Sequence, residues 1–149
     1  MRSKALIIDL DGTLCNNKHR EHFLKGPKKN WKGFYEAMDK DTVNGWCLKI
    51  MNAFSERGYL NILLTGRPEL YEEKTRRWLS KSVPPSVWNV LIMRPQDDFR
   101  PAPEFKTEVY KTRLKDRYDV LFCIEDAKET TDAWRALGLV CLQCADGEF

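Results

Sequence analysis

The stretch that decides the fold is KALIIDLDGTL, residues 4–14. Its apolar run at 4–8 is short and branched, which is typical of a strand buried on both faces of a parallel sheet. Asp9 and Asp11 follow two positions apart, so both carboxylates are expected to leave the strand toward the same crevice. Gly12 permits the sharp turn that this exit requires. The stretch therefore predicts an acidic site at the carboxyl end of the first strand.

The rest of the chain alternates short apolar runs with helical patterns. Further strands are predicted at residues 59–64, 87–93, 120–124 and 139–142, and helices at residues 34–40, 45–57, 69–80, 104–117 and 128–137. The basic segment that runs to Gly33 is expected to be a loop. This alternation predicts a single α/β domain over residues 1–149, with a five-stranded, mainly parallel sheet covered on both faces.

Polar residues follow each predicted strand, where ligands bind in folds of this kind. They are Asp9, Asp11, Thr65, Arg94, Glu125 and Asp126. Acids at the ends of buried strands are costly unless positive charge lies among them. A divalent cation meets that requirement most simply.

Composition restricts the class of protein. A 42% hydrophobic and 32% charged chain with net charge +3 is typical of an ordinary globule. No run of 18 apolar residues exists, so no membrane span is expected, and the N-terminus does not resemble a signal peptide. The five cysteines are scattered and odd in number, which favours a reducing, cytoplasmic location.

Positive charge gathers between residues 17 and 33. Six basic residues lie there against one acid, Glu21: Lys18, Arg20, Lys25, Lys28, Lys29 and Lys32. The segment is either a solvated loop or a patch that attracts phosphate-rich ligands. Trp31 within it could stack on a base or pack against its neighbours.

The D-x-D-G-T motif at 9–13 resembles the signature of the haloacid dehalogenase (HAD) superfamily of phosphotransferases. The resemblance implies a Rossmann-like three-layer sandwich, a nucleophilic Asp9, and Asp11 as general acid and then general base. A carboxylate nucleophile divides one difficult displacement into two easier ones. The resemblance also implies that Thr65 donates to a phosphoryl oxygen and that Gly66 allows close backbone approach. Arg67 would then bind the phosphate.

The same resemblance implies a lysine and a magnesium ion. Lys106 is the preferred lysine over Lys111, because it lies near the start of its predicted helix. Magnesium prefers hard oxygen ligands. The implied ligands are Asp9, the carbonyl of Asp11, Asp126, and Glu125 at a position where the family often has a second aspartate.

Later segments resemble the 3′-phosphatase domain of bacteriophage polynucleotide kinase-phosphatases. They are Arg20, TGRPE at 65–69, RWL at 77–79, MRP at 93–95, DFRP at 98–101, WRALG at 134–138 and CLQ at 141–143. This resemblance implies that Arg20 and Arg67 contact a substrate phosphate on a nucleic-acid end or a nucleotide. Ala102 departs from it, because these domains usually carry an acid there. No P-loop motif is present, so no kinase activity is expected.

Asp11 and Thr65 are only 54 positions apart, and a predicted helix occupies part of that interval, so no large cap domain is expected. An open crevice suits a large or terminal phosphate substrate. Two alternatives remain open: a small-molecule phosphatase such as a 5′-nucleotidase, and a phosphate-binding module without turnover. The sequence does not indicate the oligomeric state.

Overall fold

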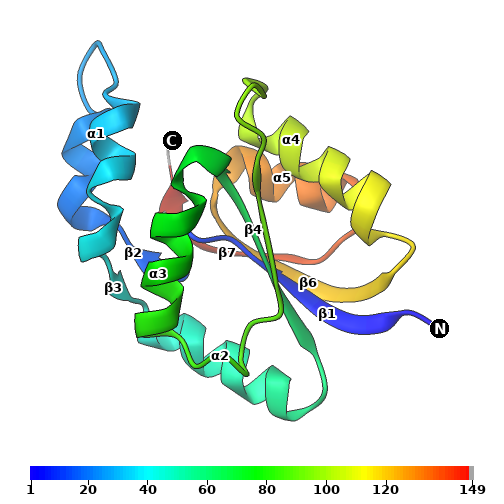
Figure 1. The fold of residues 1–149 in the computed structure, drawn as a ribbon. Helices are drawn as coiled ribbons and strands as arrows, with labels where there is room; N and C mark the ends of the chain where they lie inside the picture. The colour runs from blue at the N-terminus through cyan, green and yellow to red at the C-terminus, as the bar shows by residue number, and fades with distance from the viewer. Residues whose placement is uncertain (148–149) are drawn as a thin grey trace.

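The computed structural model describes residues 1–147 (Figure 1). One sheet contains β1 (Ser3–Ile8), β4 (Leu60–Pro68), β5 (Val90–Arg94), β6 (Tyr118–Ala127) and β7 (Cys141–Gly147). The strands lie in the order β5-β4-β1-β6-β7, and every neighbouring pair is parallel. The predicted α/β class and five-stranded sheet are therefore confirmed. β1 lies at the centre. From β1 the chain continues to β4 on one side of the sheet, whereas from β6 it continues to β7 on the other, and ligands bind in the crevice at the carboxyl ends of such strands.

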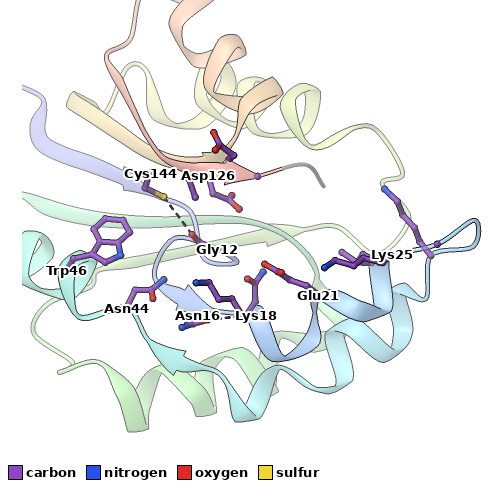
Figure 2. Close-up of a pocket in the computed structure, with 16 residues that line it drawn as sticks. Gly12, Asn16, Lys18, Glu21, Lys25, Asn44, Trp46, Asp126 and Cys144 are labelled. Atoms are coloured by element: carbon purple, nitrogen blue, oxygen red, sulfur yellow. Dashed lines mark hydrogen bonds between the residues drawn. The ribbon is translucent and has the colours of Figure 1, made fainter.

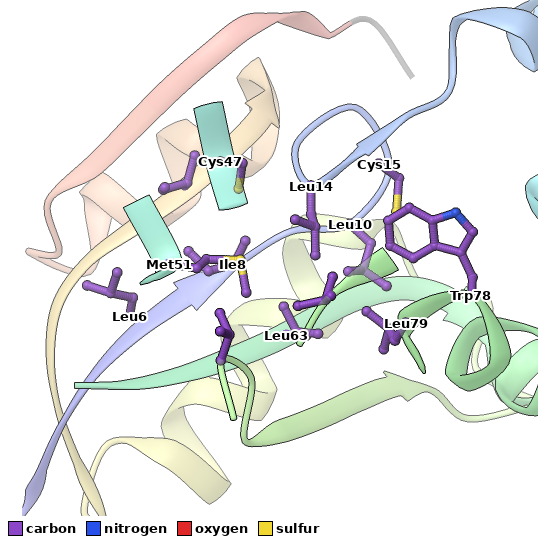
Figure 3. Packing of buried hydrophobic residues seen from close by; sticks show 13 residues of the cluster. Leu6, Ile8, Leu10, Leu14, Cys15, Cys47, Met51, Leu63, Trp78 and Leu79 are labelled. Carbon is purple, nitrogen blue, oxygen red and sulfur yellow. The ribbon is translucent and has the colours of Figure 1, made fainter. Parts of the chain in front are cut away.

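Helices cover both faces of this sheet. One apolar cluster packs the alternate residues Leu6, Ile8 and Leu63 against α2 (Gly45–Glu56) and α3 (Glu72–Ser82) (Figure 3). A second cluster packs Ile7 and Ile62 against α4 (Ala102–Val109) and α5 (Lys128–Ala136). Successive strand residues point to opposite faces, so each strand serves both clusters. The result is the expected three-layer sandwich.

The segment between β1 and α2 is structured, so the predicted loop to Gly33 is wrong. It contains an antiparallel pair, β2 (Cys15–Asn16) with β3 (Thr42–Val43), and the 3-10 helices η1 (Lys18–Leu24) and η2 (Met38–Lys40). The helix predicted at 34–40 is instead α1 (Trp31–Glu36), followed by η2. Figure 1 shows α1 beside α3. No cap domain is evident in residues 1–147.

The physical reason for this error is the kind of core that the segment has. Arg20 and Leu24 are its buried residues in η1, and the Arg20 guanidinium carbon lies 4.3 Å from the centroid of the Phe34 ring. A segment held by a buried arginine lacks the apolar periodicity by which helices are recognised in a sequence.

Three strands extend several residues beyond their predicted ends. β4 continues through Thr65 and Gly66, β6 continues through Glu125 and Asp126, and β7, predicted to end at residue 142, continues to Gly147. Regular pairing with the neighbouring strand breaks over these same residues. The polar residues therefore lie in irregular strand ends, where their side chains can turn toward the crevice. Among the helices, α3 is preceded by the 3-10 helix η3 (Glu69–Tyr71), and α4 is followed by the π-helix η4 (Tyr110–Leu114).

Two further expectations concern location. Within residues 1–147, no helix has the length and apolar character that crossing a bilayer requires. All five cysteines are free thiols, and no disulfide links them. The cellular compartment itself stays a prediction.

Asn61 joins the central sheet to two other elements. It is fully buried, and its side-chain Nδ2 donates to the carbonyls of Met51 (3.1 Å) and Val87 (2.7 Å). Asn61→Ala leaves both carbonyls without this donor, so the free energy of unfolding is expected to fall by about 2–4 kcal/mol. Urea denaturation measures this change. Asn52→Ala at a partly exposed position of α2 is the control, and equal losses in both variants would contradict the argument.

Candidate active site

Asp9 lies where three parallel strands end together. It follows Ile8, which pairs with Leu63 of β4 on one side and with Ile124 of β6 on the other. The backbone N–H of Asp9 donates to the carbonyl of Ile124 at 3.1 Å. This register brings Asp9 beside Glu125 and Asp126, although more than a hundred residues separate them in sequence.

These three acids form one buried cluster. Ligand oxygens of Asp9, Glu125 and Asp126 all lie within 4.8 Å of one another, and the residues are 6%, 2% and 7% exposed. Lys106 from α4 enters the cluster, with its Nζ 2.8 Å from Asp9 Oδ1 and 2.8 Å from Glu125 Oε2. Lys111 is exposed in η4, so Lys106 is the lysine that the fold brings to the acids.

The cluster has more negative than positive charge. Three carboxylates against one ammonium leave a formal excess of two negative charges. Burial and the neighbouring Asp9 raise the pKa of Glu125 to about 7, and burial with Asp9 and Glu125 raises the pKa of Asp126 to about 10. A divalent cation would offset the excess, and carboxylate oxygens are the ligands that Mg²⁺ prefers. The donor set therefore fits magnesium. That the backbone carbonyl of Asp11 is a magnesium ligand stays a prediction.

Two glycines make room for Asp126. Gly12 has φ +81°, and a Cβ at this position would collide with Asp126 Oδ2. A Cβ at Gly147 would lie 2.8 Å from the same oxygen. Thr13 supports the neighbouring acid, since its hydroxyl donates to Asp9 Oδ2 at 3.1 Å. The D-x-D-G-T motif thus supplies an acid, the space for a second acid and a hydrogen bond that orients the first.

The Asp11 carboxylate lies apart from this cluster. It binds two arginines, with Arg67 Nη2 2.7 Å from Asp11 Oδ1 and Arg20 Nη2 in contact with the same oxygen. Burial alone would raise the pKa of Asp11, but Arg67 and Arg20 outweigh it and hold the pKa well below its usual range. Asp11 is therefore ionised in this arrangement.

The predicted contact of Arg20 and Arg67 with a substrate phosphate is not available in this conformation. Both arginines are at most 1% exposed, and Asp11 lies against both guanidinium groups. Contact with phosphate would require Asp11 to move. Substrate binding by these arginines therefore stays a prediction that depends on a second conformation.

Asp41 is a site residue that the sequence pattern did not reveal. Its Oδ1 accepts from Arg20 Nε at 2.8 Å and its Oδ2 from Arg20 Nη2 at 2.6 Å. His19 Nε2 lies 2.6 Å from Asp41 Oδ1, and Trp78 Nε1 donates to the Asp41 carbonyl at 2.8 Å. Asp41 thus anchors Arg20 through two guanidinium nitrogens, one of which, Nη2, also contacts Asp11. No motif marks it, because an acid between a 3-10 helix and a two-residue strand looks like an ordinary turn residue.

The remaining predicted residues lie on β4. Thr65 is 1% exposed, and its Oγ1 accepts from the backbone N–H of Arg67 at 3.1 Å. The Gly66 carbonyl accepts from Arg94 Nε at 2.9 Å. Ala102 lies next to Gly66, 3.9 Å from where a Cβ would stand there. Ala102, where the resembling domains usually carry an acid, therefore lies beside Gly66 of β4.

Comparison with known proteins identifies the family. The model of the polynucleotide kinase PNKP phosphatase domain matches residues 3–149. The chain belongs to this family. As a PNKP-type phosphatase domain of the HAD class, it has the core and the acidic edge that its first motif predicted.

Solved structures agree with this assignment. A chain of the Pnkp1/Rnl/Hen1 RNA repair complex superposes with a TM-score of 0.84 at 31% identity, over 99% of this domain and 44% of that chain. The domain thus spans less than half the length of this relative.

Two more distant structures share the fold. The class C acid phosphatase from Bacillus anthracis with tungstate bound has a TM-score of 0.66 at 13% identity, over 98% of this domain and 70% of that chain. A HAD family enzyme from Bacteroides thetaiotaomicron in complex with magnesium and inorganic phosphate has a TM-score of 0.56 at 16% identity, over 99% and 96%. At these identities the likeness concerns the fold alone.

The buried network of Asp41 has a consequence for stability. Removing the carboxylate in Asp41→Ala leaves Arg20 buried with only Asp11 as a charged partner, so the free energy of unfolding is expected to fall by about 3 kcal/mol. Urea or thermal denaturation of the PNKP-type domain measures the loss. Asp39→Ala, at an exposed aspartate of η2 two positions earlier, serves as the control. A loss in Asp41→Ala no larger than in this control would show that Asp41 does not anchor the arginine.

Proposed function

We propose that this domain is a magnesium-dependent phosphomonoesterase that removes 3′-phosphate from nucleic-acid ends or nucleotides through an aspartyl-phosphate on Asp9. Membership in the PNKP phosphatase-domain family supports the substrate class. The observation that carries the mechanism is the convergence of Asp9, Glu125 and Asp126 around Lys106 at the end of β1.

Asp9 acts as the nucleophile. Its carboxylate attacks phosphorus, a new bond forms between an Asp9 oxygen and phosphorus, and the bond from phosphorus to the 3′ oxygen breaks. Lys106 and Thr13 hold the two Asp9 oxygens at 2.8 and 3.1 Å, which orients the carboxylate before the substrate arrives. Magnesium, when bound by Asp9, Asp126 and Glu125, supplies positive charge that offsets the carboxylates and the phosphoryl oxygens.

Asp11 moves the protons. In the first step, protonated Asp11 gives its proton to the leaving 3′ oxygen. In the second step, Asp11 takes a proton from the water that attacks phosphorus. The bond between phosphorus and the Asp9 oxygen breaks, which restores the Asp9 carboxylate and releases inorganic phosphate. Because Arg20 and Arg67 keep Asp11 ionised, Asp11 has to leave these arginines before it can act as an acid. Rotation toward the crevice would also expose the guanidinium groups to the substrate phosphate.

The β4 residues and Glu125 complete the site. Thr65 donates its hydroxyl to a phosphoryl oxygen, and Gly66 allows the backbone to approach the same group. Fixed donors of this kind stabilise charge that develops in the transition state without reorganisation. Glu125 holds Lys106 at 2.8 Å, so it positions the lysine as well as contributing an oxygen to the metal site.

The substrate and partner context comes from the relative of known structure. That chain occurs in an RNA repair complex with Rnl and Hen1, which supports phosphorylated nucleic-acid ends as the substrate of this domain. The domain also exposes its crevice without a cap in residues 1–147, which suits a phosphate at the end of a long chain.

A comparison of substrates tests the proposal. The domain is expected to release phosphate fastest from a 3′-phosphorylated oligonucleotide, more slowly from a 5′-phosphorylated one and from mononucleotides. Asp9→Asn is expected to reduce the rate by at least about 10³-fold, because it removes the nucleophile. Malachite-green detection of phosphate measures each rate. Preference for mononucleotides would indicate the small-molecule phosphatase, and no release from any substrate would indicate a binding module.

Metal binding gives a readout that does not depend on activity. Mg²⁺ is expected to raise the Tm of the domain, because a ligand that binds only the folded state stabilises it. Asp126→Asn is expected to weaken Mg²⁺ binding at least about 10-fold and to remove most of this increase. Differential scanning calorimetry with and without Mg²⁺ measures both effects. Asp132→Asn, an exposed acid on α5, is the matched control, and identical Mg²⁺ shifts in the two variants would refute the assignment.

A further inference from the structure

A cavity of about 660 Å³ opens beside the acidic cluster. Figure 2 shows Trp46 at one end of it and Lys25 at the other, with Gly12 and Asp126 between them. Gly12 directly follows Asp11 in the D-x-D-G-T motif, and Asp126 belongs to the acidic cluster. The cavity therefore adjoins the reacting centre, while most of its wall comes from residues outside that centre.

Three lysines contribute to the wall: Lys18, Lys25 and Lys29. None of them forms an ion pair within residues 1–147. Three acids also line the cavity, Glu21, Asp146 and Asp126, and the last of these belongs to the metal cluster, where a bound cation would offset its charge. Unpaired ammonium groups along a cavity favour an anionic ligand.

Trp46 provides a flat apolar surface at the end of this polar cavity. It lies in the first turn of α2, and 42% of its surface is exposed. Trp31, the aromatic residue considered from the sequence, lies elsewhere: it packs on Phe34 and Tyr35 at centroid distances of 5.8 and 5.9 Å and does not line the cavity. Trp46 is therefore the aromatic residue placed to stack on a base.

Asn17 gives an independent indication of a ligand. It lines the same cavity, is only 3% exposed, and its Nδ2 has no hydrogen-bond partner among residues 1–147. A buried donor without a partner is unfavourable. An oxygen of a phosphodiester or of a base would satisfy it.

We propose that this cavity holds the single-stranded nucleotides that precede the 3′-terminal phosphate, with a base on Trp46 and phosphodiesters along Lys18, Lys25 and Lys29. This inference rests on the proposed function and extends it to the polynucleotide body of the substrate. The volume is that of a typical site for a small ligand, which accommodates a short stretch of one strand. An unpaired base is also what stacking on a tryptophan requires.

Binding and turnover are measured separately to test it. Fluorescence anisotropy gives the Kd of a 3′-phosphorylated single-stranded oligonucleotide, and hydrolysis of p-nitrophenyl phosphate reports on the reacting centre alone. Trp46→Ala and the triple change of Lys18, Lys25 and Lys29 to Gln are each expected to weaken oligonucleotide binding about 10-fold. In the triple variant the slope of log Kd against log salt is expected to fall by about 2. Hydrolysis of p-nitrophenyl phosphate is expected to change less than about 2-fold, because P–O cleavage involves none of these side chains.

Matched controls remove the same charge, or an exposed aromatic ring, away from the cavity. They are the triple change of the exposed Lys40, Lys49 and Lys81 to Gln, and Phe99→Ala, whose ring is exposed and does not line the cavity. If the control variants weaken oligonucleotide binding as much as the cavity variants do, the proposal is overturned. It is also overturned if both cavity variants keep the wild-type Tm and bind the oligonucleotide with unchanged affinity. If the cavity variants bind normally and 3′-phosphate is still released, the function stands and the cavity assignment fails. If they lose binding while even the wild type releases no 3′-phosphate, the cavity stands and the proposed function fails.

Discussion

Three buried carboxylates, of which two contact one lysine, are the constraint on which the rest of this structure depends. Buried charges are expensive unless they are paired, and one ammonium cannot pair three acids. The sheet nevertheless forces them together, because the register of β1 against β6 places Asp9 directly beside Glu125 and Asp126. α4 must then deliver Lys106 to the same point, and residues 12 and 147 must be small enough to leave room for Asp126. An arrangement of this kind is explained most simply by the ion that it is suited to bind.

A second charged network, a short distance away, has a different balance. Asp11 and Asp41 carry two negative charges, and Arg20 and Arg67 carry two positive charges, so this network is neutral without a ligand. It also joins β4 to the segment between β1 and α2, because Arg67 lies on β4 while Asp11, Arg20 and Asp41 lie in that segment. The balanced network thus holds the structure together, while the unbalanced cluster next to it retains the excess negative charge that a reaction with a cation and phosphate can use.

The segment between β1 and α2 contributes residues both to the buried charged network and to the adjoining cavity. η1 sends Arg20 inward, where it binds Asp11 and Asp41, and places Lys18 on the wall of the adjoining cavity. The segment is short: it contains β2, η1, α1, η2 and β3, and no cap domain is evident in residues 1–147.

Much of this arrangement could be predicted from local sequence. The apolar run that ends in Asp9, the alternation of strands and helices, and the choice of Lys106 near a helix start all depend on patterns within a few residues, and the structure places them as predicted. The predicted loop to Gly33 failed because η1 and α1 are short and bury isolated apolar residues, Leu24 and Phe34, around a buried arginine, which leaves no apolar periodicity in the sequence.

What the sequence by itself determined is therefore the sheet, its order of elements and the acidic motif at its edge, since periodicity and spacing along the chain encode these directly. The tertiary structure alone decided that Asp41 anchors Arg20, that Asp11 rests on two arginines, and that Trp46 rather than Trp31 faces the cavity. These outcomes depend on which side chains meet across distances of tens of residues, and no local pattern carries that information.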